Sequence, residues 1–220
     1  MAVTVDVLDA EVETPWIYGK WVEPPVQNRS ERTFFRFLDA AESLLSQRHW
    51  HEVSVQDIVK GADASVGSFY NRFNDKTALL HCLDDRLGQE CELTIEQLLG
   101  EIEACPLLVG DAPAIFISLL VRLCTERRGV IRALDVARKM STNDGFTGLG
   151  PRFADGLDVF SKYLIKKNDA LGGCSVAVVS HAFQEVFMIA RESLLYRPDG
   201  VEGADLHKTL MRYFTASLAK

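Results

Sequence analysis

Apolar residues recur at spacings of three and four along almost the whole chain, beginning near Ser30. The first run places Phe34, Phe37, Ala41 and Leu45 on one face of an amphipathic helix. No segment shows the sustained alternation of apolar and polar residues that is typical of a half-buried strand. The pattern therefore predicts an all-α protein.

Glycine, proline and capping residues divide this pattern into separate helices. The expected ranges are 30–47, 55–61, 66–73, 76–99, 112–128, 129–140, 152–168, 174–197 and 202–219. We expect three parts: an acidic N-terminal arm over 1–28, a three-helix head over 29–75 and a larger helical body over 76–220. The long helix that begins at Lys76 joins the head to the body.

The composition excludes several classes of protein. With 220 residues, 47% hydrophobic and 25% charged, the chain is typical of a globular protein. No run of 18 apolar residues occurs, and the acidic N-terminus does not resemble a secretory signal. Five cysteines without a C-x-x-C pair indicate reduced thiols, so we expect a cytoplasmic protein with no metal and no cofactor. No nucleophile elbow, phosphate loop or metalloprotease motif occurs, so we expect no enzyme.

The head has the sequence features of a helix-turn-helix unit. Ser54 with Asp57 indicates a capped start for its second helix, and Ser65 for its third. The outward positions of the third helix hold only small or polar residues, which lets a backbone lie deep in the major groove of DNA. The head is electrically neutral, with seven basic and seven acidic residues over 29–80.

Over residues 30–80 the chain resembles the TetR family of transcriptional regulators. The resemblance is carried by Val55-x-x-Ile58-Val59-x-x-Ala62-x-Ala64-Ser65-x-Gly67-Ser68-Phe69-Tyr70-x-x-Phe73-x-Asp75-Lys76-x-x-Leu79. The chain departs from the family at Asp63, which stands in the turn where glycine is usual. Aspartate is among the few residues that tolerate a left-handed backbone, so we expect the turn to form.

The resemblance implies two groups of DNA-binding residues. Phosphates are contacted by Ser54, Gln56, Ser65, Tyr70, Arg72 and Lys76. Base edges are faced by Val66, Gly67, Ser68 and Asn71. For Ser54 and Ser65 the alternative role is that of a helix cap alone, and for Tyr70 it is a place in the core.

The resemblance also implies a dimer interface and an effector pocket in the body. The interface is formed by Phe183, Phe187, Leu194, Leu210 and Phe214. The pocket is formed by Phe116, Leu120, Leu123, Cys124, Phe146, Phe153 and Phe160, with His181 and Gln184 as the polar groups that orient the ligand. The alternative is that these residues pack in the protein's own core.

The resulting hypothesis is a ligand-responsive transcriptional regulator, most often a repressor in such a family. As a homodimer it binds a near-palindromic operator in double-stranded DNA, and a small apolar or amphipathic effector releases it. No membrane partner is expected. The alternative is a helical protein-interaction module that has lost sequence-specific DNA binding, for which the neutral head and the acidic arm leave room.

Overall fold

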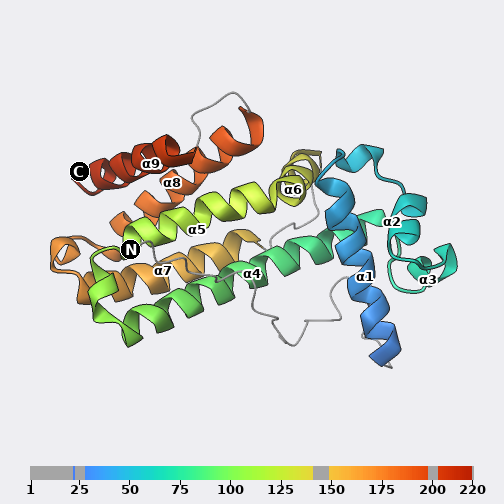
Figure 1. The fold of residues 1–220 in the computed structure, drawn as a ribbon, viewed down its shortest axis with the longest axis horizontal. Coiled ribbons are helices and arrows are strands. Elements are labelled where there is room, and N and C mark those ends of the chain that lie inside the picture. Colours follow the sequence, from blue (N-terminus) through green and yellow to red (C-terminus); the bar gives the residue numbers. More distant parts are fainter. Residues whose placement is uncertain (1–21, 23–27, 141–148, 198–202, 220) are drawn as a thin grey trace. The chain divides into compact units, whose positions relative to one another are not determined.

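The computed structural model describes residue 22 and residues 28–140, 149–197 and 203–219, and every regular element in these ranges is helical (Figure 1). The α-helices are α1 (Asn28–Leu45), α2 (Val55–Gly61), α3 (Val66–Tyr70), α4 (Lys76–Ala104), α5 (Ala112–Glu126), α6 (Arg128–Met140), α7 (Leu149–Lys167), α8 (Val176–Tyr196) and α9 (Gly203–Leu218). Short 3-10 helices lie at η1 (Trp50–Glu52), η2 (Pro106–Val109) and η3 (Asp169–Leu171). The all-α prediction is confirmed.

Two helices end three or more residues from where we expected, α3 at Tyr70 and α4 at Ala104, whereas the other ends differ by at most two. α3 stops at Tyr70 because its last turn tightens: the Arg72 N–H donates to the Phe69 carbonyl, three residues back, at 2.9 Å. α4 continues to Ala104 and ends before Pro106, because the residue preceding a proline is disfavoured in helical geometry.

The chain forms two compact units. The head unit, in its described part, contains α1, α2, α3, α4 up to Leu87, and α6 from Gly129 onward. The bundle unit contains α4 from Gly88 onward together with α5, α7, α8 and α9. α4 runs without a break from one unit into the other. α6 is thus grouped with the head, although the sequence pattern alone places it in the body.

The core of the head unit is a cluster of phenylalanines that fixes α3 against α1. Phe37 meets Phe69 edge to face with ring centroids 5.5 Å apart, and Phe69 lies 5.0 Å from Phe73. Phe34 stacks on Phe73 at 5.6 Å. All four side chains are at most 2% exposed, so the inner side of α3 is held firmly and its outer side is left for a partner.

α6 is tied to the head unit at two places. At Gly129 a Cβ atom would collide with the carbonyl oxygen of Leu45 at the end of α1, so only glycine allows this approach. Near the other end of α6, the Arg138 guanidinium donates to the buried Asp84 carboxylate of α4 at 2.9 Å. These contacts make α6 part of the head unit's packing.

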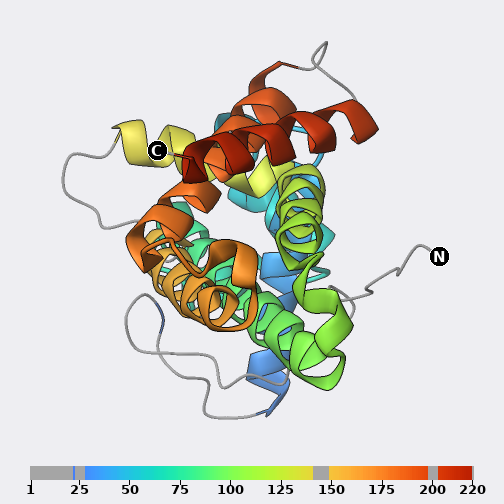
Figure 2. The ribbon, with the colours of Figure 1, turned by 90° about the vertical axis from the view of Figure 1, so that its left-hand side faces the viewer.

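In the bundle unit, α5, α8 and α9 pack against one another, and Figure 2 shows α8 and α9 side by side. Phe183 of α8 lies at the centre, with ring centroids 5.0 Å from Phe116, 5.6 Å from Phe160 and 4.4 Å from Phe214. No described helix is long and apolar enough to cross a membrane.

This packing corrects most of the predicted dimer interface. Phe183, Leu210 and Phe214 are at most 3% exposed and belong to the core of one chain. Phe187 is also buried and packs on Phe153 at 4.7 Å. Only Leu194 is half-buried. The cause is that α8 and α9 are apolar on more than one side. Helical periodicity points to the most apolar stripe of each helix, and that stripe is the one buried in the chain's own core.

Candidate nucleic-acid interface

Side-chain caps fix the starts of both helices in the helix-turn-helix unit. The Ser54 hydroxyl donates to the Asp57 carboxylate at 2.6 Å and accepts from the Asp57 N–H at 3.1 Å. The Ser54 N–H in turn donates to Asp57, which completes a capping box. Ser65 accepts from the Ser68 N–H at 3.1 Å and caps α3. Both serines therefore act as helix caps, and a phosphate contact by either remains a prediction.

Two hydrogen bonds lower the pKa of the Asp57 carboxyl below its usual value. The one from the Ser54 hydroxyl has the larger effect, and the one from the Ser54 N–H has the smaller. A carboxyl with a lowered pKa in the folded state contributes stability at neutral pH, and the contribution is lost as the pH falls through that pKa. The capping box is thus at full strength at neutral pH.

Asp63 occupies the turn between α2 and α3 with a φ of 47°, and it is the only non-glycine residue with positive φ in the described part of the chain. The left-handed backbone expected for this turn is confirmed. Arg36 of α1 holds the turn: its Nη2 donates to the Asp63 carbonyl at 2.7 Å and lies 3.3 Å from the Asp63 carboxylate. A side chain from α1 therefore fixes the turn that aims α3.

The outer face of α3 is open. Val66 is 43% exposed and Tyr70 54%, and Gly67 and Asn71 are exposed beside them. A Cβ atom added at Gly67 would meet nothing nearer than the Ser65 hydroxyl, at 3.9 Å. The protein's own packing therefore does not require glycine here, whereas close approach of another backbone or of a DNA groove does.

The remaining predicted contacts lie around this face with differing exposure. Gln56 on α2 and Ser65 are exposed, whereas Ser68 and Arg72 are half-buried. Tyr70 is not a core residue, because its ring stands edge-on against Phe69 at 5.4 Å with its other side in solvent. The structure thus brings the candidates from α2 and α3 onto one unit, and their DNA contacts stay predictions.

Lys76 is the exception among the predicted phosphate contacts. Its ammonium donates to the carbonyls of Trp50 and Val53 at 2.8 and 2.7 Å and lies 4.3 Å from the centre of the Trp50 ring. Burial lowers the pKa of Lys76. Lys76 thus ties the start of α4 to the segment before α2, and we infer that this, rather than a phosphate contact, is its role.

A family model described as bacterial regulatory proteins of the tetR family matches residues 37–83. An uncharacterized HTH-type transcriptional regulator of Mycobacterium tuberculosis is 34% identical over 98 residues, which cover 40% of this chain and 48% of that protein. The chain thus spans about half the length of this relative.

The helix-turn-helix segment of this chain, residues 37–83, belongs to the TetR family.

Two solved structures share the fold of this chain. A putative TetR-family transcriptional regulator from Mesorhizobium loti superposes with a TM-score of 0.64 at 19% identity, covering 88% of this chain and 98% of that one. NalD of Pseudomonas aeruginosa, the secondary repressor of the MexAB-OprM multidrug efflux pump, superposes with a TM-score of 0.60 at 17% identity, covering 87% and 98%. At these identities the similarity shows the fold alone.

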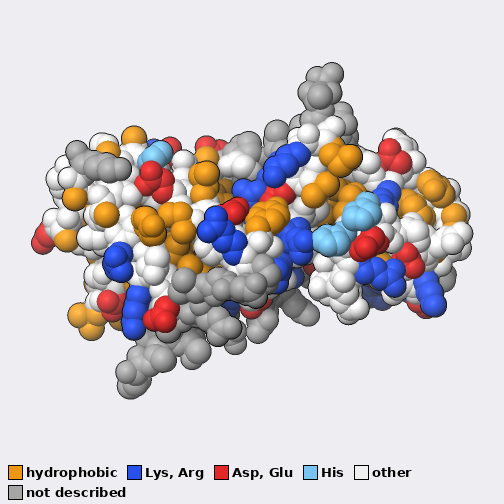
Figure 3. Space-filling model, turned by 90° about the horizontal axis from the view of Figure 1, so that it is seen from above, with side chains coloured by type: hydrophobic (Ala, Val, Ile, Leu, Met, Phe, Trp, Pro, Cys, Tyr) orange, Lys and Arg blue, Asp and Glu red, His pale blue; other side chains and the backbone are white. Residues whose placement is uncertain are grey.

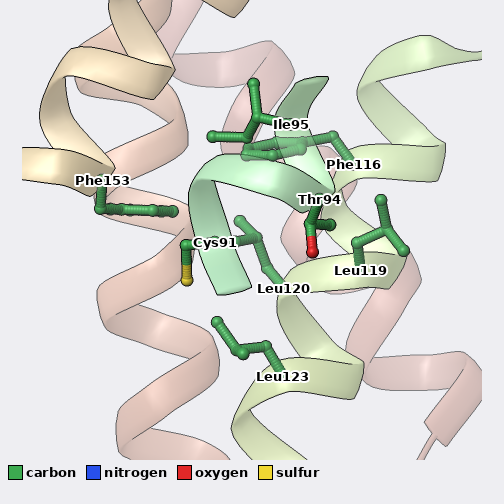
Figure 4. A pocket seen from close by; sticks show the side chains of 8 residues that line it. All are labelled: Cys91, Thr94, Ile95, Phe116, Leu119, Leu120, Leu123 and Phe153. Atoms are coloured by element: carbon green, nitrogen blue, oxygen red, sulfur yellow. The ribbon is translucent and has the colours of Figure 1, made fainter. Parts of the chain in front are cut away.

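The bundle unit contains a small apolar cavity of about 20 Å³ between α4, α5 and α7 (Figure 4). Four predicted pocket residues line it: Phe116, Leu120, Leu123 and Phe153. Four further lining residues escaped prediction: Cys91, Thr94, Ile95 and Leu119. The α4 residues among them share the apolar spacing of an ordinary core stripe, so no sequence signal separates them from the core.

The other predicted pocket residues lie elsewhere. Cys124 and Phe160 are buried but do not line the cavity, and Phe160 packs on Phe116 at 4.7 Å. His181 is exposed and lies 3.7 Å from Glu185 on the outside of α8, and Gln184 is half-buried without lining the cavity. Phe146 lies outside the described residues. The polar groups expected to orient a ligand are thus not in the cavity.

The cavity wall carries no charge. Burial raises the pKa of the Cys91 thiol, so the sulfur stays neutral. The Thr94 hydroxyl donates to the Glu90 carbonyl at 2.7 Å within α4, which occupies its hydrogen. At about 20 Å³ the cavity has room for a water-sized group, so a larger ligand requires the wall to open.

The outer sides of α8 and α9 expose several apolar side chains among charged ones (Figure 3). Met188 is 65% exposed and Tyr213 51%. Glu185 of α8 accepts a hydrogen bond from the Ser217 hydroxyl of α9 at 2.5 Å and joins the two helices beside them. Among the described residues, no group of three or more histidine, cysteine or acidic side chains is arranged to hold a metal ion.

Proposed function

We propose that this protein is a ligand-responsive transcriptional regulator that binds a near-palindromic DNA operator as a homodimer. The observation that carries the proposal is the outer face of α3, where Gly67 leaves the backbone bare although no described residue occupies the space beside it. An α-helix fits the major groove, and a bare backbone brings it closest to the base edges.

The phosphate contacts in this proposal come from residues around that face. Gln56, Ser65 and Tyr70 are exposed and carry groups that hydrogen-bond to phosphate oxygens, and Arg72 adds a cation. Because Arg72 is the only cation among these four contacts, few counterions are released on binding. We therefore expect a shallow dependence of affinity on salt.

In this proposal the dimer forms through α8 and α9, with Met188 near the two-fold axis. Glu185 and Arg191 lie three residues to either side of Met188. In an antiparallel pairing of α8 with its copy, these opposite charges face each other across the interface, as a two-fold contact requires. The exposed Met188 and Tyr213 supply the apolar centre.

The effector in this proposal is uncharged and apolar, because the cavity wall offers it no charge and, besides the occupied Thr94 hydroxyl, only the weak S–H donor of Cys91. Entry of such a molecule moves α5, whose last turn leads directly into α6 of the head unit. Effector binding then lowers operator affinity by favouring a different arrangement of the two heads. A repressor role is supported by NalD, which has the same fold and is itself a repressor.

Selection of bound duplexes from a random library with the purified full-length protein, at stated salt, tests the proposal. The expected result is an enriched near-palindrome, bound about fivefold more weakly by Tyr70→Phe, because one hydrogen bond to phosphate is lost. Val159→Phe on α7 changes an exposed side chain of the bundle unit and serves as the control. A folded dimer that enriches no sequence contradicts the proposal and favours the interaction-module alternative.

A further inference from the structure

We infer that each operator half-site presents an A·T pair to Val66 and another to Asn71. The inference rests on the proposed function, because it concerns the base pairs that the same face of α3 meets. It adds the chemical identity of those base pairs, which follows from the side chains that are exposed there.

The exposed side chains of α3 form a continuous face. At about 100° per residue, Val66, Tyr70, Gly67 and Asn71 follow one another over an arc of about 140°. Phe69 points to the opposite side, where it is fully buried against Phe37 and Phe73. Figure 1 shows α3 at the outer edge of the head unit, and the exposure of Val66 and Tyr70 shows that no described helix of that unit covers this face.

The chemistry of this face matches adenine and thymine. In the major groove only thymine presents a methyl group, which suits the exposed apolar Val66. Adenine presents an acceptor beside a donor, and the Asn71 amide supplies the complementary donor and acceptor. Asn71 keeps helical backbone angles, with φ −70° and ψ −8°, so its side chain continues the face of α3.

The same face lacks the groups that read guanine and cytosine. Guanine presents two acceptors and is read by paired donors from arginine or lysine, whereas cytosine is read by a carboxylate. Residues 65–71 contain no lysine, arginine, aspartate or glutamate. Arg72, the first cation after them, lies beyond the end of α3 and is half-buried.

The spacing of Val66 and Asn71 along the helix limits the distance between the two A·T base pairs that they contact. Val66 and Asn71 are five residues apart, which is about 7.5 Å along a helix axis at ~1.5 Å per residue. Base pairs are stacked about 3.4 Å apart. Because a helix tilted in the groove covers less of the DNA axis than its own length, the two A·T pairs stand at most about two steps apart in each half-site.

Base substitutions in the selected operator test the inference with the wild-type protein. Replacing thymine by uracil removes only the methyl group, and at the Val66 position it weakens binding about fourfold, the equivalent of one buried methyl. Replacing the A·T pair at the Asn71 position by G·C weakens binding about 5- to 150-fold. Neither measurement depends on the folding of a variant.

Variants of Val66 and Asn71 then show which residue contacts which base pair of the operator. Val66→Ala binds thymine and uracil operators equally, and Asn71→Ala loses its preference for A·T over G·C at its own position only. Val159→Ala, an equally exposed valine on α7 (52% against 43%), keeps the wild-type profile. Half-sites with G·C at the positions that α3 protects, or variants that keep the wild-type preference, overturn the inference while the proposed function stands. Selection of no sequence at all overturns both.

Discussion

At the scale of single residues, Asp63 shows how a chain keeps a left-handed turn without glycine. Its φ of 47° is costly for a residue with a Cβ atom, and Arg36 holds the turn through the Asp63 carbonyl rather than mainly through the exposed carboxylate. The sequence predicted this backbone because the family pattern places glycine there. It did not reveal Arg36, which is 27 residues away.

We expect Asp63→Gly to raise the free energy of unfolding by about 0.5 kcal/mol, because the relief of strain outweighs the greater freedom of the unfolded chain. The hydrogen bond from Arg36 to the backbone carbonyl survives this change. Asp63→Ala keeps the strain and loses the local polar contacts, so it lowers stability. Urea unfolding checks both variants, and a destabilised Asp63→Gly protein would contradict the strain argument.

Lys76 is a residue for which the structure shows partners that the sequence did not indicate. A cation at the start of a helix opposes the helix dipole, and a phosphate partner explains such a cation when only the sequence is known. The structure supplies other partners, the carbonyls of Trp50 and Val53, from a segment whose backbone path no periodicity indicates.

Lys76→Met should lower the free energy of unfolding by about 1–3 kcal/mol, because it removes two charge-assisted hydrogen bonds and a cation–π contact. The slope of log affinity against log salt for operator binding should stay unchanged, because no phosphate contact is lost. Thermal unfolding and a salt titration measure the two effects. A slope that falls by about one, with unchanged stability, would restore the phosphate role.

At the scale of elements, helical periodicity predicted which segments are helices but not which faces they pair. The buried stripe of α8 was assigned to a second subunit, yet Phe183 packs on Phe116 and Phe214 of its own chain. The grouping of α6 with the head was equally hidden, because it depends on Gly129 and on the end of α1. Pairing is a property of three-dimensional packing, which a single amphipathic pattern leaves open.

The docking of α6 makes a prediction about Gly129. Gly129→Ala should lower the free energy of unfolding by about 1–3 kcal/mol, because the new Cβ atom meets the rigid backbone of Leu45. Gly100→Ala on α4 is the matched control: nothing lies within 4 Å, so the better helix former should raise stability by about 0.5–1 kcal/mol. Denaturant unfolding compares them, and equal stability changes would remove the packing role of Gly129.

At the scale of the whole molecule, the all-α class and the placement of the nine helices in the described residues were predictable from the sequence. The cavity was predicted only in part, because a cavity is space that packing leaves over. Cys91, Thr94 and Ile95 look like core residues in the sequence, and only the arrangement of α4 against α5 and α7 gives them an open side.

The proposed dimer predicts the effect of a charge at Met188. Met188→Arg should convert the dimer to a monomer and weaken operator binding at least a hundredfold, since one half-site then binds alone. Leu107→Arg in η2 changes a side chain that is 90% exposed and should leave the dimer intact. Analytical ultracentrifugation reports the mass of each variant. A dimeric Met188→Arg protein would move the interface away from α8.

If the outer face of α3 enters a DNA groove, the substitution Gly67→Ala should separate DNA binding from stability. The protein has space for the added methyl group, so we expect a free energy of unfolding that is unchanged or higher by up to about 1 kcal/mol. Affinity for the selected operator should fall at least tenfold, because the Cβ atom holds the backbone away from the groove. Undiminished operator binding by a stable Gly67→Ala protein would show that α3 does not enter the groove by this face.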